Sequence, residues 1–327
     1  MRALVVERLA ADFAGCAVRE IPIPTPGSGE VRVRVIAAAV NFPDLLMTRG
    51  EYQHKPPLPF IPGLEMAGEI EALGEGAEGW KIGDAVVGAP RVGGFSEFAV
   101  AVAATLKPKP ARLSFARAAA YGAAYLTAWV ALVRRAEVQP GEWVLVHGAA
   151  GGVGLACVDL AKVLGCRVIA ASASDKKLAA VAAEYAPDAI LNVTGGFREA
   201  VKAITGGRGA DVICDPVGGD VLDESIRCIA FDGRLLTIGF ASGRIPTLPV
   251  NLPLIKGFSL IGVRAGEYGR RFPERGRENV DAVWALASEG KIRPRVDAEF
   301  PLAEWRAAFD RLAGRAVIGK AVIRPDR

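Results

Sequence analysis

The sequence predicts an α/β protein that combines a mostly antiparallel β domain with a doubly wound parallel sheet. Residues 1–120 contain short strand-like runs interrupted by proline and glycine, whereas residues 144–263 alternate between strand-like and helix-like segments. A glycine-rich turn at residues 148–154 connects the first strand of the alternating region to its first helix. With 327 residues, the chain is long enough for two such domains.

The β domain is predicted from short apolar runs bounded by turn-forming residues. Residues 31–35 alternate valine with arginine, which is typical of a strand with one buried and one exposed face. Further strands are expected at residues 1–8, 65–73 and 84–88, and a helical region is expected at 114–133.

The parallel sheet is predicted from buried strands that are followed by helices. The expected strands are residues 144–146, 167–171, 189–193, 210–216, 233–239 and 259–263. The expected helices between them are residues 155–164, 175–185, 197–204 and 222–229.

The chain after residue 264 is expected to return to the β domain. The predicted elements there are a helix at 279–289, a strand near 298–300, a helix at 302–312 and a strand at 320–323. We therefore place the first domain at residues 1–121, completed by 265–327, and the second domain at 122–264.

The glycine-rich turn indicates dinucleotide binding. Its pattern is Ala149-x-Gly151-x-x-Gly154, a variant of the dinucleotide fingerprint with alanine in the first position. Gly151 lets the backbone approach a pyrophosphate, and Gly154 allows the helix to pack closely on the strand. The unpaired N–H groups and the positive end of the helix dipole attract phosphate. A tight turn without a ligand is the alternative interpretation.

Composition argues against several other classes of protein. The net charge of +4 comes from interspersed charges, and the arginines at 270–277 lack the interleaved aromatic residues of a nucleic-acid-binding stripe. No apolar run reaches the length of a membrane-spanning helix, and the N-terminus is charged too early for a secretory signal. The five cysteines are scattered without a C-x-x-C pair. We therefore expect a cytoplasmic protein with reduced thiols and with neither nucleic acid nor membrane as a partner.

Five segments match a known family in their order and spacing. They are Asn41-Phe-Pro-Asp44, Gly50-Glu-Tyr52, Pro59-Phe-Ile-Pro-Gly-Leu-Glu-Met-Ala-Gly68, residues 147–154 and Gly319-Lys-Ala-Val322. On these residues the chain resembles the medium-chain dehydrogenase/reductase superfamily, and within it the zinc-free quinone oxidoreductase branch that includes zeta-crystallin. The resemblance implies a GroES-like catalytic β domain and a Rossmann domain that binds NADPH. It also implies reduction of quinones or related α,β-unsaturated carbonyls, with the acceptor in the interdomain cleft over the nicotinamide.

No catalytic metal is expected. Zinc alcohol dehydrogenases of this superfamily carry a cysteine where this chain has Asn41 and a histidine where it has Leu64, and neither residue replaces those zinc ligands. The four-cysteine structural zinc lobe is missing as well. The two histidines are expected elsewhere, His54 in a loop and His147 at the end of a buried strand, and Glu65 is expected to be structural. Without a Lewis acid, the site suits an electron-poor acceptor that delocalises the incoming charge itself.

By resemblance, four residues line or support the catalytic site: Asn41, Asp44, Tyr52 and Arg264. Each also has a simpler interpretation. Asn41 suits a turn, and Asp44 suits a cap for a helix over residues 45–47. Tyr52 suits a cover for the core, and Arg264 suits a solvent-exposed cation.

NADPH is expected as the cofactor because the second strand of the parallel sheet does not end in an acid. NAD enzymes use an acid there to bind the ribose 2′-hydroxyl, and this chain has Ser172. Ser174, Lys176 and Lys177 follow and suit a 2′-phosphate, and Lys177 matches the family's phosphate-contacting lysine. A solvated helix start is the alternative. The residues expected to bind the cofactor are Ala150, Gly151, Gly152, Val153, Gly154, Ser172, Ser174, Lys177, Gly239 and Lys320.

Two features point to looser selectivity for NADPH over NADH. Quinone reductases of this family often have an Asn-Tyr pair after the next strand, whose tyrosine reaches the adenosine phosphate, and this chain has Asn192 followed by Val193. Asp175, next to Lys176, opposes the positive charge of the lysines.

Two other functions remain open from the sequence. An enoyl- or acryloyl-thioester reductase shares the expected fold, and Arg270, Arg271 and Arg275 suit the phosphates of coenzyme A. An NADPH-binding, crystallin-like protein with little turnover has the same glycine turn. For each function we expect a homodimer, because the strand at 259–263 otherwise leaves an exposed sheet edge through which relatives dimerise.

Overall fold

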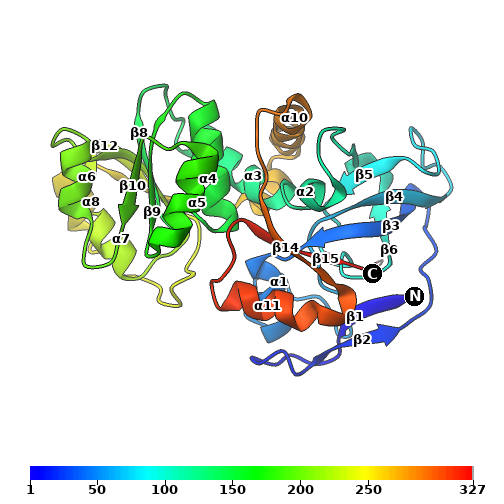
Figure 1. Ribbon diagram of the computed structural model, residues 1–327. Helices are drawn as coiled ribbons and strands as arrows, with labels where there is room; N and C mark the ends of the chain where they lie inside the picture. The colour runs from blue at the N-terminus through cyan, green and yellow to red at the C-terminus, as the bar shows by residue number, and fades with distance from the viewer. Residues whose placement is uncertain (326–327) are drawn as a thin grey trace. The chain divides into compact units, whose positions relative to one another are not determined.

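The computed structural model describes residues 1–325 and forms two compact units. The first unit comprises Met1–Ala123, Ala287–Gly290 and the chain from Pro294 onward, and the second comprises Ala124–Leu286 and Lys291–Arg293. Figure 1 follows the chain from the N-terminus in blue to the C-terminus in red. No helix among residues 1–325 is long and apolar enough to cross a membrane.

The first unit is built on a mostly antiparallel sheet, as the sequence predicts. Seven strands form this sheet in the order β14-β15-β3-β4-β5-β7, with β6 also paired to β3, and β14 and β15 pair in parallel. A separate two-stranded sheet consists of β1 and β2. The strands are β1 (Arg2–Val6), β2 (Cys16–Glu20), β3 (Glu30–Ala39), β4 (Met66–Leu73), β5 (Ala85–Gly88), β6 (Phe98–Val102), β7 (Lys107–Pro108), β14 (Val296–Pro301) and β15 (Lys320–Arg324).

Alternating residues determine the two faces of β3. The three valines within residues 31–35 are fully buried in the core of this unit. Arg32 and Arg34 point to the other face, where they pair with Glu71 and Glu69 of β4 at 2.5 Å each. The alternation of valine and arginine that predicts this strand therefore also explains which of its side chains are buried.

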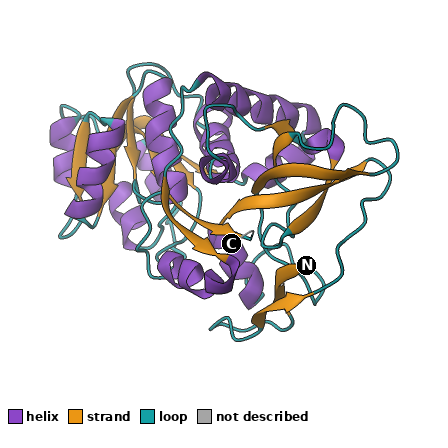
Figure 2. Ribbon diagram, turned by 45° about the vertical axis from the view of Figure 1, so that its right-hand side comes forward, coloured by secondary structure: helices purple, strands orange, loops and turns teal. Residues whose placement is uncertain are grey.

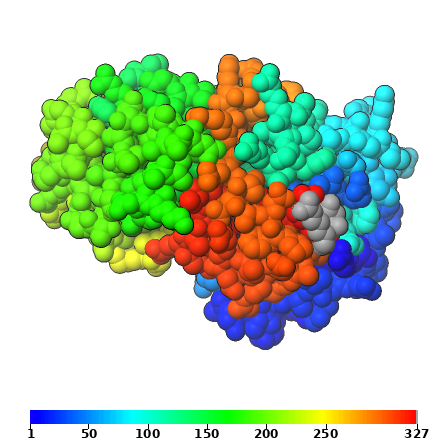
Figure 3. Space-filling model, in the orientation of Figure 1, coloured from blue at the N-terminus to red at the C-terminus, as the bar shows by residue number. Residues whose placement is uncertain are grey.

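The C-terminal segment completes the first unit. β15 pairs with β3, and the rings of Phe13, Phe95 and Trp305 surround Phe309 at centroid distances of 5.3–5.9 Å. Figure 3 shows the red C-terminal segment against the blue N-terminal one. The helical elements of this unit are α1 (Phe42–Arg49), η1 (Ala103–Thr105), α2 (Phe115–Ala119), η3 (Leu302–Glu304) and α11 (Trp305–Ala313).

The second unit is a parallel sheet of six strands, and the doubly wound prediction is confirmed. Its order is β10-β9-β8-β11-β12-β13, so the direction of winding reverses between β8 and β11. Figure 2 shows these strands in orange with helices around them in purple. The strands are β8 (Trp143–Val146), β9 (Arg167–Ser172), β10 (Ala189–Asn192), β11 (Ala210–Asp215), β12 (Ile229–Thr237) and β13 (Ser259–Gly262).

The helices of the second unit follow most of the predicted positions. α4 and α5 pack on β9, and α7 packs on β11. The helical elements are α3 (Gly122–Trp129), which begins at the boundary between the units, the π-helical η2 (Val130–Arg135), α4 (Gly152–Val163), α5 (Asp175–Tyr185), α6 (Arg198–Ile204), α7 (Asp220–Ser225), α8 (Asn251–Lys256), α9 (Ala265–Arg271) and α10 (Pro273–Glu289).

Two predicted helices differ from the structure. The expected helix at 114–133 is interrupted between α2 and α3, where the Glu65 carboxylate accepts the Ala123 N–H at 2.8 Å and starts a new helix. The expected helix at 222–229 ends at Ser225, and Ile229 already belongs to β12. The short apolar run at residues 228–231 spans the end of the expected helix and the start of β12, and such a run fits a helix or a strand equally well.

Residues 265–286 lie in the second unit, whereas the sequence-based boundary assigned them to the first. Side-chain contacts explain their position. Arg134 of η2 donates to Asn279 at 2.7 Å and to Glu278 at 2.6 Å, and both partners are on α10. Asn279 is buried, so this contact belongs to the interior of the unit and not only to its surface.

Candidate functional site

The glycine-rich turn between β8 and α4 has the geometry expected of the fingerprint. Gly148 has a φ of +57°, Gly151 is the N-cap of α4, and the Gly151 N–H donates to the Gly148 carbonyl at 2.8 Å. A Cβ on Gly154 would lie 2.2 Å from the Gly148 oxygen, so only glycine fits there. A Cβ on Gly151 would lie 3.3 Å from the same oxygen, and Gly151 is exposed.

The turn therefore presents its backbone around Gly151 to solvent and packs its other residues inward. Ala149 and Ala150 are buried, and the Ala149 N–H donates to the Ala171 carbonyl at 3.0 Å. Gly152 and Val153 are half-buried at the start of α4. A helix start with unpaired N–H groups and an exposed glycine is suited to an anionic group.

Polar residues gather where β9 and β10 end. Ser172 and Asn192 are register partners at the carboxyl ends of these strands. The Ser174 N–H donates to the Ser172 Oγ at 3.4 Å, and the Ser174 Oγ accepts the Lys177 N–H at 3.4 Å as the N-cap of α5. Asn192 Nδ2 donates to Asp175 Oδ1 at 2.7 Å. The structure thus brings the predicted phosphate-binding residues together at the carboxyl ends of β9 and β10.

A second turn, at the carboxyl end of β11, packs against the glycine-rich turn. Asp215, the last residue of β11, accepts the N–H groups of Val217 and Gly218 at 2.8 Å each through Oδ1. A Cβ on Gly148 would touch Val217 and Pro216, and a Cβ on Gly239 would lie 3.4 Å from the Pro216 oxygen. Gly239, a predicted cofactor residue, therefore lies beside this turn.

Asp215 was not among the predicted site residues, although an acid followed by Pro-Val-Gly-Gly at the end of a strand is a turn signal. Its side chain is fully buried, and its Oδ2 has no hydrogen-bond partner. Burial raises the pKa of this carboxyl, while the N–H groups of Gly218 and Val217 act in the opposite direction.

In the first unit, a buried polar network joins residues that are far apart in the sequence. Lys320 Nζ donates to Asn41 Oδ1 at 2.5 Å and pairs with Glu65 at 3.0 Å. Asn41 Nδ2 donates to Glu65 Oε1 at 3.0 Å and to the Ala39 carbonyl at 3.1 Å. Exposed fractions are 6% for Lys320, 3% for Glu65 and 9% for Asn41.

This network determines what Asn41 can do chemically. Both hydrogens of its amide are donated within the protein, and the ammonium of Lys320 fixes which end of the amide carries the oxygen. Asn41 therefore positions its neighbours and has no N–H left for a bound carbonyl. The ammonium of Lys320 donates to Asn41 and pairs with Glu65, and the role of Lys320 at the cofactor stays a prediction.

Asp44 lies next to this network and stabilises the start of α1. Its carboxylate accepts the Asn41 N–H at 2.8 Å and the Gly63 N–H at 3.0 Å. Burial raises the pKa of Asp44 to about 7, and the two N–H groups and the Lys320 cation oppose this shift. The capping interpretation thus matches the geometry, and the side chain is fully buried.

We expect ionisation of Asp44 to weaken the fold as pH rises. Its folded pKa of about 7 lies above the ordinary value of 3.8, so its stabilising contribution is complete below pH 3.8 and is lost as pH rises through 7. Relative to Asp44→Asn, the wild type should lose up to about 4 kcal/mol across this range. Urea unfolding of both proteins at several pH values measures this difference. A constant difference between them would contradict the prediction.

The wild type must be compared with Asp44→Asn because the titration of His147 changes stability with pH in the opposite direction. Its Nε2 lies 2.9 Å from the Ser225 Oγ, and its ring packs 4.8 Å from that of Phe197. Burial lowers the pKa of His147 to about 3, so its contribution is lost as pH falls from 6.5 to 3. His147 is a neutral, structural histidine.

The remaining predicted residues are more exposed. Tyr52 is half-buried and packs against the core of the first unit. Arg264 is exposed at the N-terminus of α9 in the second unit, and His54 is half-buried in a loop. Among residues 1–325, no group of three or more His, Cys, Asp or Glu residues could hold a metal ion.

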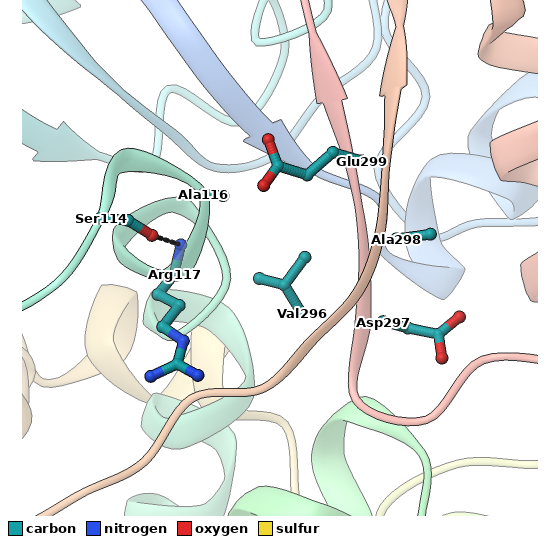
Figure 4. A pocket seen from close by; sticks show the side chains of 7 residues that line it. All are labelled: Ser114, Ala116, Arg117, Val296, Asp297, Ala298 and Glu299. Carbon is teal, nitrogen blue, oxygen red and sulfur yellow. Dashed lines mark hydrogen bonds between the residues drawn. The ribbon is translucent and has the colours of Figure 1, made fainter.

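A separate hollow of about 460 Å³ lies in the first unit between α2 and β14. Figure 4 shows Glu299 and Arg117 at this hollow. Glu299 pairs with Arg324 at 2.8 Å, and Asp297 pairs with Arg311 at 2.6 Å, so both acids are already engaged. None of the residues of the Asn41 network lines this hollow.

Two domain families match the chain. Residues 27–111 match the alcohol dehydrogenase GroES-like domain, and residues 152–285 match a domain described as a zinc-binding dehydrogenase. A quinone oxidoreductase-like protein 2 homolog from Nematostella vectensis is 40% identical over 91% of this chain and 82% of its own length. Human quinone oxidoreductase is 30% identical over 93% of this chain and 92% of its own length.

Solved structures of related oxidoreductases share the fold. Escherichia coli quinone oxidoreductase complexed with NADPH has a TM-score of 0.89 at 28% identity, covering 99% of this chain and all of its own. An NAD-dependent alcohol dehydrogenase has a TM-score of 0.91 at 32% identity, covering 99% of both chains. CurK enoyl reductase has a TM-score of 0.88 at 27% identity, covering 99% of this chain and 98% of its own. The chain therefore belongs to the medium-chain dehydrogenase/reductase superfamily of oxidoreductases, in its zeta-crystallin-like quinone oxidoreductase branch.

Proposed function

We propose that this oxidoreductase uses NADPH to reduce quinones or related α,β-unsaturated carbonyls without a catalytic zinc. The main support is the glycine turn at 148–154, which is exposed at Gly151, beside a strand end that carries Ser172 in place of an acid. Relatives named as quinone oxidoreductases, one of them solved with NADPH, agree with this assignment.

The second unit supplies the residues that would hold NADPH. The backbone from Gly151 to Gly154 would bind the pyrophosphate, and Ser172, Ser174 and Lys177 would bind the 2′-phosphate. When bound, NADPH supplies a hydride to the acceptor, and a proton completes the reduction. Gly239 also lies at the carboxyl ends of the strands, and it leaves room there because it carries no side chain.

The network around Lys320 supports catalysis that does not depend on zinc. Asn41 is bound through its amide to Lys320, Glu65 and Ala39, so it is not free to ligate a metal without breaking these contacts. In this proposal, Asn41 and Asp44 hold the local backbone in place, and Tyr52 and Arg264 support the acceptor.

An enoyl- or acryloyl-thioester reductase is the alternative, which the similarity to CurK enoyl reductase favours. The arginines that would bind coenzyme A are partly engaged. Arg270 and Arg271 pair with Glu267 at 2.8 and 2.9 Å, and they lower the pKa of Glu267 to about 2. Arg275 lies 5.5 Å from the centre of the Phe272 ring. These contacts reduce the positive charge available to a coenzyme A phosphate.

Initial rates of NADPH oxidation with a quinone and with acryloyl-CoA distinguish these functions. We expect faster turnover with the quinone. A faster reaction with the thioester would favour the alternative, and NADPH binding without turnover of any acceptor would favour a crystallin-like binding protein.

We also propose that the protein is a cytoplasmic homodimer. The cysteines of residues 1–325 are unpaired and buried, as expected of a reducing compartment. β13 is an edge strand, and large apolar side chains are exposed around it and on α8. Exposed fractions are 82% for Phe231, 87% for Val250, 82% for Leu254 and 71% for Ile255.

Replacing both Leu254 and Ile255 with lysine should therefore convert a dimer into a monomer. The reason is that two charges would be buried without partners at the proposed interface. Light scattering measures the mass of the wild type and the variant, with Ile82→Lys, at an exposed site in the first unit, as the control. A monomeric wild type would contradict the proposed dimer.

A further inference from the structure

The carboxyl ends of β9 and β10 carry one acid whose position is fixed. Asp175 is the first residue of α5, and its Oδ1 accepts Asn192 Nδ2 at 2.7 Å. The Asn192 Oδ1 accepts the Thr194 N–H at 2.9 Å, so the orientation of this amide is determined. The Asp175 carboxylate is thus held over the ends of the two strands.

This carboxylate lies beside the residues proposed to bind the 2′-phosphate. Ser172 is the register partner of Asn192, and Ser174 immediately precedes Asp175. A phosphate bound by the two serines would therefore be repelled by the Asp175 carboxylate. The hydrogen bond from Asn192 keeps this carboxylate from rotating away. A ribose with a free 2′-hydroxyl carries no such charge, and its hydroxyl is a donor that a carboxylate can accept.

We propose that Asp175, held by Asn192, determines coenzyme selectivity and allows this chain to use NADH as well as NADPH. The inference rests on the proposed function, because it places the adenosine ribose at Ser172 and Ser174. At this site the serines and Lys177 favour binding of the 2′-phosphate, whereas Asp175 disfavours it. The similarity of the fold to both an NADPH-bound and an NAD-dependent relative is consistent with such a site.

The acid also has a structural role that the test must separate from selectivity. A negative charge in the first turn stabilises α5 through the helix dipole, and this effect is the same for both coenzymes. Repulsion of a 2′-phosphate affects only the phosphorylated coenzyme, and it weakens as salt increases. The ratio of the two affinities therefore reports on selectivity alone.

The test measures binding of adenosine 2′,5′-bisphosphate and of 5′-AMP by calorimetry, so that it does not depend on turnover. Asp175→Asn preserves an acceptor for Asn192 and removes the charge. We expect it to tighten binding of the bisphosphate about three- to tenfold at low salt and to leave 5′-AMP within about twofold. The gain should shrink at high salt.

Glu184→Gln is the matched control, because it removes one negative charge near the other end of the same helix, about 13 Å away. It should leave the ratio of affinities unchanged. An unchanged ratio in Asp175→Asn, with both fragments still binding, would overturn this inference alone. A wild-type protein that binds neither fragment would overturn the proposed function as well.

Discussion

Replacing Lys320 with methionine is expected to lower the free energy of unfolding by about 3–5 kcal/mol. The ammonium of Lys320 pairs with Glu65 at 3.0 Å, and both side chains are almost completely buried. Methionine leaves the Glu65 carboxylate in the interior without its cation, and the Asn41 oxygen also loses its donor. Guanidinium unfolding monitored by circular dichroism measures the effect.

The double variant Lys320→Met/Glu65→Gln separates charge from packing. It should be less destabilised than the sum of the two single variants, with a coupling energy of about 1–3 kcal/mol. Arg19→Met is the control, because Arg19 pairs with Glu7 at an exposed site and its loss should leave the unfolding midpoint unchanged. Strict additivity of the Lys320 and Glu65 variants would show that the two residues do not act as a pair.

Replacing Gly154 with alanine is expected to damage both stability and NADPH binding. The added Cβ would lie 2.2 Å from the Gly148 oxygen and 2.7 Å from its carbon, so the turn must open or α4 must move away from β8. Overpacking of this kind costs about 1–3 kcal/mol of stability. Displacement of the N–H groups should weaken NADPH binding about tenfold or more.

Gly151→Ala is the matched comparison for Gly154→Ala. Its Cβ would lie 3.3 Å from the Gly148 oxygen, and φ at Gly151 is −77°, which alanine adopts readily. Stability should therefore be retained, while NADPH binding should weaken about tenfold to a hundredfold because the methyl group occupies the approach to the pyrophosphate. Thermal unfolding and NADPH titration of both variants measure these effects. Unimpaired NADPH binding by Gly151→Ala would place the pyrophosphate elsewhere.

The fold was largely predictable because its strongest signals are local. The alternation in residues 31–35 and the apolar run that ends at Val146 determine burial directly, and the glycine turn follows the latter. Predictions failed where local signals are ambiguous or short. The short apolar run at residues 228–231 suits a helix or a strand, and α8 has only six residues with a proline inside.

The candidate site was only partly predictable. The residues predicted to bind the cofactor in the second unit are close in sequence or at the ends of neighbouring strands, so topology alone brings them together. The pairing of Lys320 with Asn41 spans 279 residues, and no spacing rule connects them. Both residues are therefore predicted only by resemblance, which points to Lys320 at the cofactor and does not reveal its contact with Asn41. Likewise, the contact between Asn192 and Asp175 depends on how β10 meets the start of α5.

Quinone-dependent oxidation of NADPH by zinc-depleted protein is the most direct test of the proposed function. The protein is dialysed against a strong chelator, its zinc content is measured, and the absorbance of NADPH is followed after addition of a quinone. We predict turnover at an undiminished rate without measurable zinc. Failure to oxidise NADPH, or oxidation that appears only when zinc is restored, would contradict a metal-free NADPH-dependent quinone reductase.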